Sequence, residues 1–331
     1  MMLYIVNNSH DPYFNMAVEE YLLYELEIGE RYLTLWQNRP TVVVGRNQNT
    51  WDEVNLEFIK EHNVAVVRRL TGGGAVYHDQ GNLNFTFIFK NQKSGTYDFA
   101  GFMAPVADAL KKLGLAAAID GRNDITINGK KVSGNSQYRQ KDRVIHHGTL
   151  LFDVNLANLE NSLQVGHDKL TKRGVSSVRN RVTNIKQLLS PPIEMDQFKG
   201  LIKEALTAAF GGEQRDYLPT PGDLRRIEEL KREKYERWDW NFGASPSYNV
   251  KKSARFPWGK LDILLDVREG KISGCKIYGD FFGRDDLRPL EKALQDVPFQ
   301  EAEIGKALRS VEPSEYIPGL KREVLCDLLS K

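Results

Sequence analysis

The segment Arg68–Asp79, with the sequence RRLTGGGAVYHD, constrains the fold of this chain more than any other stretch. It follows the apolar, β-branched run Val64–Val67, which predicts a strand that enters from a buried sheet. The alternation of side chains resumes after Val76, so the three glycines lie between strands and do not open a helix. This order excludes the Walker loop and the dinucleotide-binding fingerprint, because both need a helix directly after the glycines.

Two features of this segment suit an anionic ligand. Gly72, Gly73 and Gly74 carry no Cβ atoms, so their N–H groups can approach a ligand closely. Arg68 and Arg69 stand just upstream and offer charged forks that suit carboxylate or phosphate oxygens. The segment therefore predicts a glycine-rich β-loop that binds an anion, such as a nucleotide phosphate. The alternative is a tight hairpin whose arginines lie in solvent.

Length and composition limit the class of protein. A chain of 331 residues is long enough for two domains, and 41% hydrophobic and 27% charged residues are ordinary for a soluble globular protein. No apolar run approaches the roughly 20 residues that span a bilayer, and the first residues do not resemble a signal peptide. The net charge of +2 and the lack of a long basic block give no argument for a nucleic-acid partner. Cys275 and Cys326 form neither a disulfide framework nor a metal-ligand spacing, so we expect a cytoplasmic protein. From the apolar runs and the charge we expect neither a membrane nor a nucleic-acid partner.

Periodicity and turn signals predict an α+β or mixed α/β fold, with most of the β structure early in the chain and helices outside the sheet. Asn15 is expected to cap the first helix, and Tyr32–Trp36 and Thr41–Val44 are expected to form paired strands. Asn84–Phe89 alternates as a strand with its phenylalanines on one face. Further helices are expected at Asp52–His62, Phe99–Leu113, Asn155–Gln164, Thr183–Leu189, Met195–Phe210 and Gly222–Arg237.

Two further polar segments follow the glycine segment. Asn128-Gly129 is a strong signal for a two-residue hairpin, and the strand after it carries Lys130 and Lys131. The segment His146–Phe152 predicts another strand. Gly45–Asn49 is interpreted either as a strand exit that contacts a ligand or as a simple turn.

The composition changes near Trp238–Pro246, where aromatic and turn residues predict a domain boundary. We therefore expect a catalytic domain over residues 1–245 and a small α/β accessory domain over residues 248–331. The second domain is expected to contain a hairpin of Lys260–Val267 and Lys271–Ile277, followed by two or three helices.

The polar segments contain no nucleophilic catalyst. Both cysteines lie beyond the expected boundary, and no serine has the Gly-x-Ser-x-Gly context of a nucleophile elbow. His146 and His147 are adjacent, so they point to opposite faces of a strand and do not form a zinc pair. Fixed cations and backbone donors remain, and these suit the binding of ATP and a carboxylate during phosphoryl or nucleotidyl transfer.

At this point the residues resemble the lipoate–protein ligase A family. The motifs that carry the resemblance are RRLTGGGAVYHD, GRND at 121–124, KVSG at 131–134, HHGTLL at 146–151, GVSSVRNRVTN at 174–184 and WDWNFG at 238–243. They extend over nearly the whole chain. The resemblance implies a catalytic fold shared with biotin ligases and octanoyltransferases.

The resemblance also implies a two-step reaction. Lipoate and ATP, accompanied by Mg²⁺, would give lipoyl-AMP and pyrophosphate, and a lysine ε-amine of a carrier domain would then attack the mixed anhydride and release AMP. The carriers would be the lipoyl domains of 2-oxoacid dehydrogenase complexes and the glycine-cleavage H protein. The sequence identifies no protein metal ligands, because ATP phosphates and water would mainly hold the magnesium ion.

Lys131 matches the family's essential lysine and would hold the lipoate carboxylate beside the α-phosphate. Strand alternation agrees that Lys131 and Lys130 point to opposite faces, and it separates Arg69 from Arg68 in the same way. By the resemblance, these residues would line the site: Arg69, Gly74, Ala75, Val76 and Tyr77 toward ATP, and Gly72 and Gly73 toward lipoate. Supporting roles are expected for Asn123, Asp124 and His147, although His147 is equally consistent with a structural role. Trp36, Val42 and Val44 are candidates for an apolar slot around the lipoyl chain.

Two other functions remain open from the sequence. An octanoyl or lipoyl transferase on the same fold would pass the acyl group through a cysteine or directly from a carrier thioester. The first 274 residues contain no cysteine, which argues against the cysteine-dependent route. A non-catalytic regulator that binds a nucleotide or an acyl group is the other alternative.

Overall fold

The computed structural model describes residues 2–90, 98–164, 181–210, 214–243, 248–283 and 286–330. The motif residues 174–180 and the expected linker at 244–247 lie outside the described residues.

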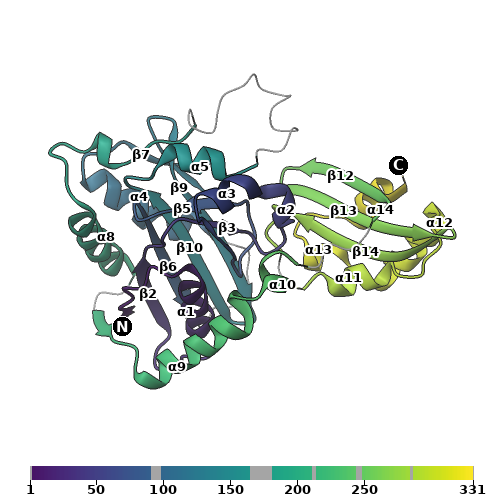
Figure 1. The fold of residues 1–331 in the computed structure, drawn as a ribbon, viewed down its shortest axis with the longest axis horizontal. Helices are drawn as coiled ribbons and strands as arrows, with labels where there is room; N and C mark the ends of the chain where they lie inside the picture. Colours follow the sequence, from purple (N-terminus) through teal and green to yellow (C-terminus); the bar gives the residue numbers. More distant parts are fainter. Residues whose placement is uncertain are drawn as a thin grey trace.

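The larger part of the molecule is built on a mixed eight-stranded sheet with the strand order β11-β1-β2-β6-β10-β9-β8-β7. Its strands are β1 (Met2–Ile5), β2 (Arg31–Trp36), β6 (Asn82–Phe89), β7 (Ala117–Asp120), β8 (Asp124–Ile127), β9 (Lys130–Gln140), β10 (Arg143–Leu151) and β11 (Gln214–Tyr217). β1 pairs in parallel with β2 and β11, and the other neighbouring pairs are antiparallel. This mixed sheet with outer helices confirms the predicted fold class (Figure 1).

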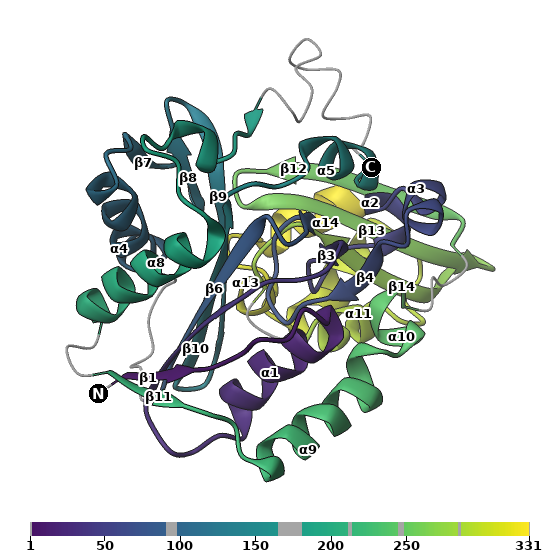
Figure 2. The same cartoon turned by 60° about the vertical axis from the view of Figure 1, so that its left-hand side comes forward.

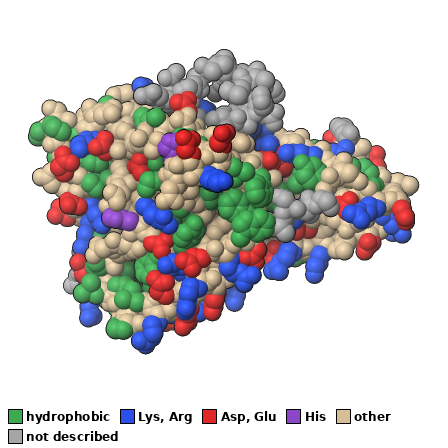
Figure 3. Space-filling model, viewed as in Figure 1, with side chains coloured by type: hydrophobic (Ala, Val, Ile, Leu, Met, Phe, Trp, Pro, Cys, Tyr) green, Lys and Arg blue, Asp and Glu red, His purple; other side chains and the backbone are tan. Residues whose placement is uncertain are grey.

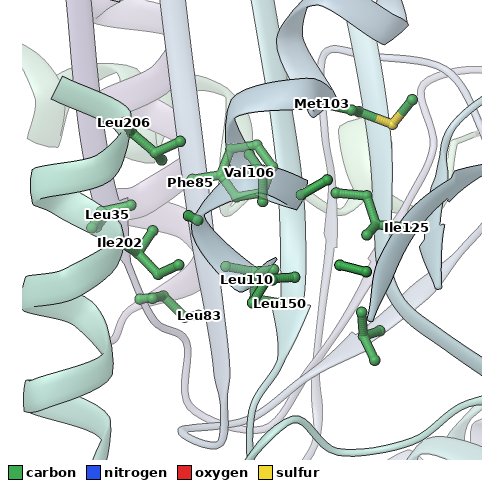
Figure 4. Packing of buried hydrophobic residues seen from close by; sticks show 14 of the residues in the cluster. Leu35, Leu83, Phe85, Met103, Val106, Leu110, Ile125, Leu150, Ile202 and Leu206 are labelled. Atoms are coloured by element: carbon green, nitrogen blue, oxygen red, sulfur yellow. The ribbon is translucent and has the colours of Figure 1, made fainter. Parts of the chain in front are cut away.

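Helices cover both faces of the large sheet, and the central strands are therefore buried on both sides. On one face, Phe85 of β6 packs against α4 (Phe99–Lys112) and α8 (Met195–Phe210) (Figure 4). Phe87 belongs to the same cluster. The other face is covered by α1 (Pro12–Tyr24) and α9 (Pro221–Leu230) (Figure 2). Ile88 packs with residues of both helices. Phe89 joins Phe85 and Phe87 in the first cluster, so the predicted one-sided alternation of this strand is confirmed.

A second sheet of three strands, in the order β4-β3-β5, lies over the face covered by α1 and carries the glycine segment. Its strands are β3 (Thr41–Val44), β4 (Ala65–Arg68) and β5 (Val76–His78). Val43 faces the cluster shared with the large sheet, whereas Val42 and Val44 face a cluster that includes residues of α3 (Leu56–Glu61) and α5 (Leu156–Ser162).

The C-terminal part is a separate small layer of sheet and helices, drawn at the right of Figure 1. An antiparallel sheet of β12 (Val250–Phe256), β13 (Gly259–Arg268) and β14 (Lys271–Gly279) packs against helices on one face. The predicted hairpin is confirmed, with Glu269 and Gly270 at positive φ in its turn. The prediction of two or three helices is wrong, because four short α-helices follow: α11 (Arg288–Ala293), α12 (Glu301–Ala307), α13 (Pro313–Tyr316) and α14 (Arg322–Ser330).

Asn15 does not cap the first helix, contrary to the prediction. Asp11 is the cap, since its carboxylate accepts the N–H of Tyr13, and Pro12 occupies the first helical turn. Asn15 lies one turn inside α1, where its buried amide bonds to Asn7 and Asn38. The helix therefore begins where proline fixes the backbone, and the amide connects two neighbouring loops.

The predicted pairing of Tyr32–Trp36 with Thr41–Val44 is also wrong. β2 pairs with β1 and β6 in the large sheet, whereas β3 lies between β4 and β5 in the small sheet. The segment between β2 and β3 therefore passes from the large sheet to the small sheet and does not form a hairpin turn.

Several predicted helices have different bounds. Residues 52–62 divide into α2 (Thr50–Glu53) and α3, because Val54 is extended and Asn55 caps the second helix. Residues 183–189 contain only a 3₁₀ turn at Lys186–Leu188. After α9, a π-helical turn at Lys231–Tyr235 leads to α10 (Trp238–Asn241).

The surface carries lysine and arginine side chains interspersed with acidic ones on the face shown in Figure 3. The same face carries a patch of hydrophobic side chains over α2 and α10 (Figure 3). Trp51 of α2 and Trp238 of α10 have partly exposed rings that contact one another and Phe242. In the described part of the chain, no helix combines the length and the apolar character that crossing a bilayer would require.

Candidate functional site

The three glycines lie between two strands, as the sequence predicts, and both of these strands pair with β3. Its three glycines serve different purposes. A Cβ on Gly72 would lie 2.3 Å from the carbonyl oxygen of Phe281, which belongs to the C-terminal domain. Gly73 has φ +89°, a value that favours glycine, and Gly74 has nothing within 4 Å of its missing Cβ. Gly74 is therefore the glycine that faces open space.

The two arginines point to opposite sides of the strand end, as predicted. Arg68 donates hydrogen bonds to Thr50 Oγ1 and to the carbonyl oxygens of Gly45, Arg46, Gln48, Trp240 and Asn241. It thus fastens α2 and α10 to the glycine segment. Gly45 and its neighbours form a turn closed by the Gln48 side chain, and this supports the simpler of the two interpretations of that segment.

Arg69 turns back onto the glycine segment itself. Its guanidinium donates to the carbonyl oxygens of Val43, Gly72 and Gly74 and to Thr71 Oγ1. Burial away from water lowers the pKa of both arginines to about 10, and both remain charged at neutral pH. Neither guanidinium forms an ion pair with a described residue, so backbone oxygens satisfy most of their donors.

Lys131 occupies the strand that follows the Asn128-Gly129 turn. Both turn residues have positive φ, as the hairpin signal predicts. A bulge between β8 and β9 leaves Val132 without a partner, so Lys131 and Gly134 face the same space. The Lys131 ammonium lies 2.7 Å from Asp124 Oδ1. A Cβ on Gly134 would lie 3.0 Å from Lys131 Nζ, so the missing side chain at position 134 leaves room for the ammonium.

A cavity and a groove meet at Lys131. The cavity has a volume of about 130 Å³ and an apolar wall that includes Met16, Trp36, Val43 and Val76. The groove is larger, about 730 Å³, and runs past Tyr77, Asp124 and Thr126. The residues common to both are Gly74, Ala75, Val76, Lys131, Gly134 and Thr149.

The structure brings most of the predicted site residues to these two spaces. Those that line the cavity are Arg69, Gly73, Gly74, Ala75, Val76, Asn123, Lys131 and His147. Tyr77 and Asp124 line the groove, whereas Gly72 lies beneath Phe281 and lines neither space. Of the candidates for the apolar slot, Trp36 lines the cavity, but Val42 and Val44 point away from it.

The two adjacent histidines have different surroundings. His146 stacks on Phe102 with 4.8 Å between ring centroids, and burial holds its pKa well below 6.5. His147 lines the cavity and bonds to Glu19 and Thr71. Alternation therefore separates them as predicted.

Sequence reasoning missed several residues of the cavity wall, namely Met16, Val43, His78, Asn84, Asn135, Ser136 and Thr149. His78 is the most unusual of them, because burial and the neighbouring Arg69 lower its pKa to about 3. His78 directly follows the predicted site residue Tyr77, and this position is the sequence signal that could have identified it. Val43 lies between the candidates Val42 and Val44, and alternation along β3 puts it on the opposite face from both. Met16 and Asn84 come from elements that meet the glycine segment only in the folded chain. Among the described residues, no group of three His, Cys, Asp or Glu side chains has the arrangement of a metal site.

Comparison with known proteins places this geometry in a family. The family described as the lipoyl protein ligase A/B catalytic domain matches residues 11–207, and that of the bacterial lipoate protein ligase C-terminus matches residues 245–329. The lipoate–protein ligase LplJ of Bacillus subtilis is 40% identical over 99% of this chain and 100% of its own length.

Two solved structures extend the comparison. Plasmodium falciparum LipL1 in complex with lipoate has a TM-score of 0.78 and 25% identity, covering 99% of this chain and 97% of its own. A lipoate–protein ligase A bound with ATP has a TM-score of 0.62 and 26% identity, covering 73% of this chain and 98% of its own. The chain therefore belongs to the lipoyl protein ligase A/B family, and its residues 245–329 match the C-terminus of the bacterial lipoate protein ligases.

Proposed function

We propose that this protein activates lipoate with ATP and transfers the lipoyl group to a lysine of a carrier domain. The observation that carries the proposal is the position of Lys131, where a cavity walled by Met16, Trp36 and Val43 opens into a larger groove whose lining includes the charged side chains of Asp120, Asp124 and Arg181. Lipoate is an apolar chain that ends in a carboxylate, and ATP is a polar molecule with a reactive α-phosphate. The cavity suits the first, the groove suits the second, and the ammonium of Lys131 lies where the two reacting ends would meet.

The first step joins the two substrates. A carboxylate oxygen of lipoate attacks the α-phosphorus, the bond from phosphorus to the bridging oxygen breaks, and pyrophosphate leaves. Lys131 would contact both the carboxylate and the α-phosphate, so a fixed ammonium offsets their mutual repulsion and the charge that develops. The backbone from Gly74 to Tyr77 would lie along the adenylate, because Gly74, Ala75 and Val76 line both spaces.

The second step needs no nucleophile from this protein. The ε-amine of the carrier lysine attacks the carbonyl carbon of lipoyl-AMP, the bond to the phosphate oxygen breaks, and the amine nitrogen loses a proton as the amide forms. AMP is already a good leaving group, so an acyl-enzyme is unnecessary. The acceptors we propose are lipoyl domains of 2-oxoacid dehydrogenase complexes and the glycine-cleavage H protein.

Magnesium would enter the groove with ATP. Asp120 and Asp124 line the groove and offer the carboxylate oxygens that this ion prefers, while phosphates and water would supply the remaining ligands. We place the reaction in the cytoplasm, since Cys275 and Cys326 are both free thiols.

A cysteine-dependent transferase finds less support in the structure. Cys275 lies in the C-terminal sheet, and burial raises the pKa of its thiol to about 12. A thiol with such a pKa provides little thiolate at neutral pH. Neither cysteine lines the cavity or the groove.

Replacement of Lys131 tests the proposal. Lys131→Ala should lower the rate of pyrophosphate release from lipoate and ATP by roughly 10²–10³-fold, comparable to the loss of one fixed donor at a developing charge. Lys131→Arg should also fail, because a planar fork does not replace a compact ammonium.

Lys130→Ala is the matched control for this test, since Lys130 is exposed on the other face of the same strand. It should keep nearly the full rate. Equal losses in Lys130→Ala and Lys131→Ala would contradict the assignment, and a wild-type protein that releases no pyrophosphate with lipoate and ATP would contradict the function.

A further inference from the structure

A continuous chain of buried hydrogen bonds connects the wall of the cavity to the glycine segment. Glu19, on α1, is at its centre and is 1% exposed. Its Oε1 atom lies 2.6 Å from Thr86 Oγ1 and 2.8 Å from His147 Nδ1. Trp36 Nε1 reaches Thr86 Oγ1 at 2.9 Å, which completes one arm of the chain.

The other arm leads from Glu19 to Arg69. His147 Nε2 lies 2.8 Å from Thr71 Oγ1, and Arg69 Nε lies 3.0 Å from the same oxygen. Arg69 in turn holds the carbonyl oxygens of Gly72 and Gly74 at 2.6 and 2.9 Å. The second arm therefore ends on the backbone of the glycine segment.

The chemistry of the two ends fixes the direction of the hydrogen bonds on both sides of Thr86 and of the hydrogen bond between Arg69 and Thr71. The indole of Trp36 and the guanidinium of Arg69 can only donate, whereas an ionised Glu19 can only accept. Thr86 accepts from Trp36 and donates to Glu19. Thr71 Oγ1 accepts from Arg69 and also bonds to His147 Nε2. The Nδ1 atom of His147 therefore carries a proton and donates a hydrogen bond to the ionised Glu19.

We propose that Glu19 is a positioning residue for lipoate activation: its buried carboxylate orients His147 and Thr71, and through them it fixes Arg69 and the backbone at Gly72 and Gly74. This inference rests on the proposed function, and it assigns a role to a residue that does not line the cavity or the groove. It also explains why a carboxylate is buried in α1.

Charge supports the same assignment. Glu19 Oε1 is bonded, but Oε2 has no hydrogen-bond partner among the described residues. A buried carboxylate with one unpaired oxygen is costly, so it needs a compensating interaction. Arg69 supplies one, because its positive charge is close enough for Glu19 to raise the pKa of its guanidinium against the effect of burial. The central carboxylate and the terminal guanidinium thus stabilise one another across Thr71 and His147.

Glu19→Gln tests the proposal in the full-length protein. It keeps the size and the Oε1 acceptor but removes the charge. We expect kcat/KM for pyrophosphate release from lipoate and ATP to fall roughly 10- to 100-fold, as when a supporting partner of a functional group is lost. The neighbouring Glu20→Gln is the control, because Glu20 binds Lys234 and Tyr235 away from the cavity. It should stay within about twofold of the wild type, whereas equal rates for the two variants would overturn the proposal.

Thr71 tests the chain from its other end and does not depend on the folding of a Glu19 variant. Thr71→Val removes the hydroxyl at nearly constant volume and should reproduce the loss in kcat/KM, while Thr71→Ser keeps the hydroxyl and should recover most of it. The double variant Glu19→Gln, Thr71→Val should be no slower than the slower single variant, because both changes break the same chain. Equal activity of Thr71→Val and Thr71→Ser, or losses that multiply in the double variant, would overturn the proposal. The wild-type rate tests the proposed function by itself, whereas the ratios among variants test this inference.

Discussion

Neighbouring residues of the same type have separate tasks throughout this site. Arg68 fastens α2 and α10, while Arg69 holds the glycine segment. Lys131 meets the cavity and the groove, whereas Lys130 is exposed. In each pair the alternation of a strand makes the division, so the sequence alone indicates that the two members differ. It does not indicate the partners, because Asn241 is distant from Arg68 in the chain and meets it only after folding.

His78 should make the stability of the protein depend on pH. Its pKa is about 3 in the folded protein and 6.5 ordinarily, so only the unfolded chain binds the proton between these values. The contribution of His78 to the free energy of unfolding is therefore fully present above pH 6.5 and decreases as the pH falls. Between pH 7 and pH 4.5 this residue should remove about 2–3 kcal/mol, at 1.36 kcal/mol for each pH unit below 6.5.

The measurement is urea unfolding of the wild type and His78→Gln at both pH values. The variant should lose that part of the pH dependence, whatever its stability at pH 7. His62→Gln is the control, because the side chain of His62 is 43% exposed. An unchanged pH dependence in His78→Gln would show that His78 is protonated in the folded protein or is already compensated by another group.

Individual elements were predictable where a local signal determines them. The Asn128-Gly129 turn, the alternation of β6 and the helix α8 follow from a few adjacent residues. The pairing of β2 with β6 does not, since it joins strands about fifty residues apart. The sequence therefore indicated which segments are strands, but not that β2 and β3 belong to different sheets.

The glycine segment shows the same limit within one element. The sequence suggests one purpose for three glycines, but the C-terminal domain covers Gly72 and leaves Gly74 open. Gly72→Ala should therefore weaken the contact between the domains, because its Cβ would lie 2.3 Å from Phe281 O and 3.0 Å from Phe282 Cα. Both are backbone atoms, so the loop at 281–282 must move.

Thermal unfolding of Gly72→Ala and Gly74→Ala tests this difference. We expect Gly72→Ala to lower the midpoint by several degrees, as a destabilisation of roughly 1–3 kcal/mol would do in a chain of this size. Gly74→Ala should change the midpoint little, since nothing lies within 4 Å of its new atom. Similar midpoints for both variants would mean that the contact adapts without cost.

The two parts of the molecule meet directly over the glycine segment. Phe282 of the C-terminal domain belongs to the hydrophobic cluster beneath α4 and packs against Phe99 with 5.1 Å between ring centroids. The guanidinium of Arg122 lies 4.2 Å from the Phe282 ring centroid and donates to the carbonyl oxygen of Trp258 at 2.9 Å. A backbone hydrogen bond of 2.7 Å from Gly279 to Asn47 completes the contact. The composition of the sequence suggested two domains, but it gave no sign that one phenylalanine of the second completes the core of the first.

This contact bears on the two half-reactions in different ways. Activation of lipoate requires a firmly held glycine segment and exclusion of water, because a mixed anhydride hydrolyses when it is exposed. Transfer requires that a carrier lysine reach the adenylate, which we expect to be easier when the C-terminal domain moves aside. The contact around Phe282 should therefore favour activation more than transfer.

Phe282→Ala in the full-length chain separates these steps. It should slow pyrophosphate release from lipoate and ATP by about tenfold, which corresponds to about 1.4 kcal/mol of activation free energy, because the packing that holds the C-terminal part over the glycine segment is lost. Transfer from supplied lipoyl-AMP to a carrier domain should keep most of its rate. Phe299→Ala is the matched control, because Phe299 packs in the C-terminal core near the β13–β14 turn, where its N–H binds the carbonyl oxygen of Gly270. If Phe282→Ala and Phe299→Ala slow both half-reactions equally, the domain contact has no special role in activation, and the C-terminal domain would be left with carrier docking as its task.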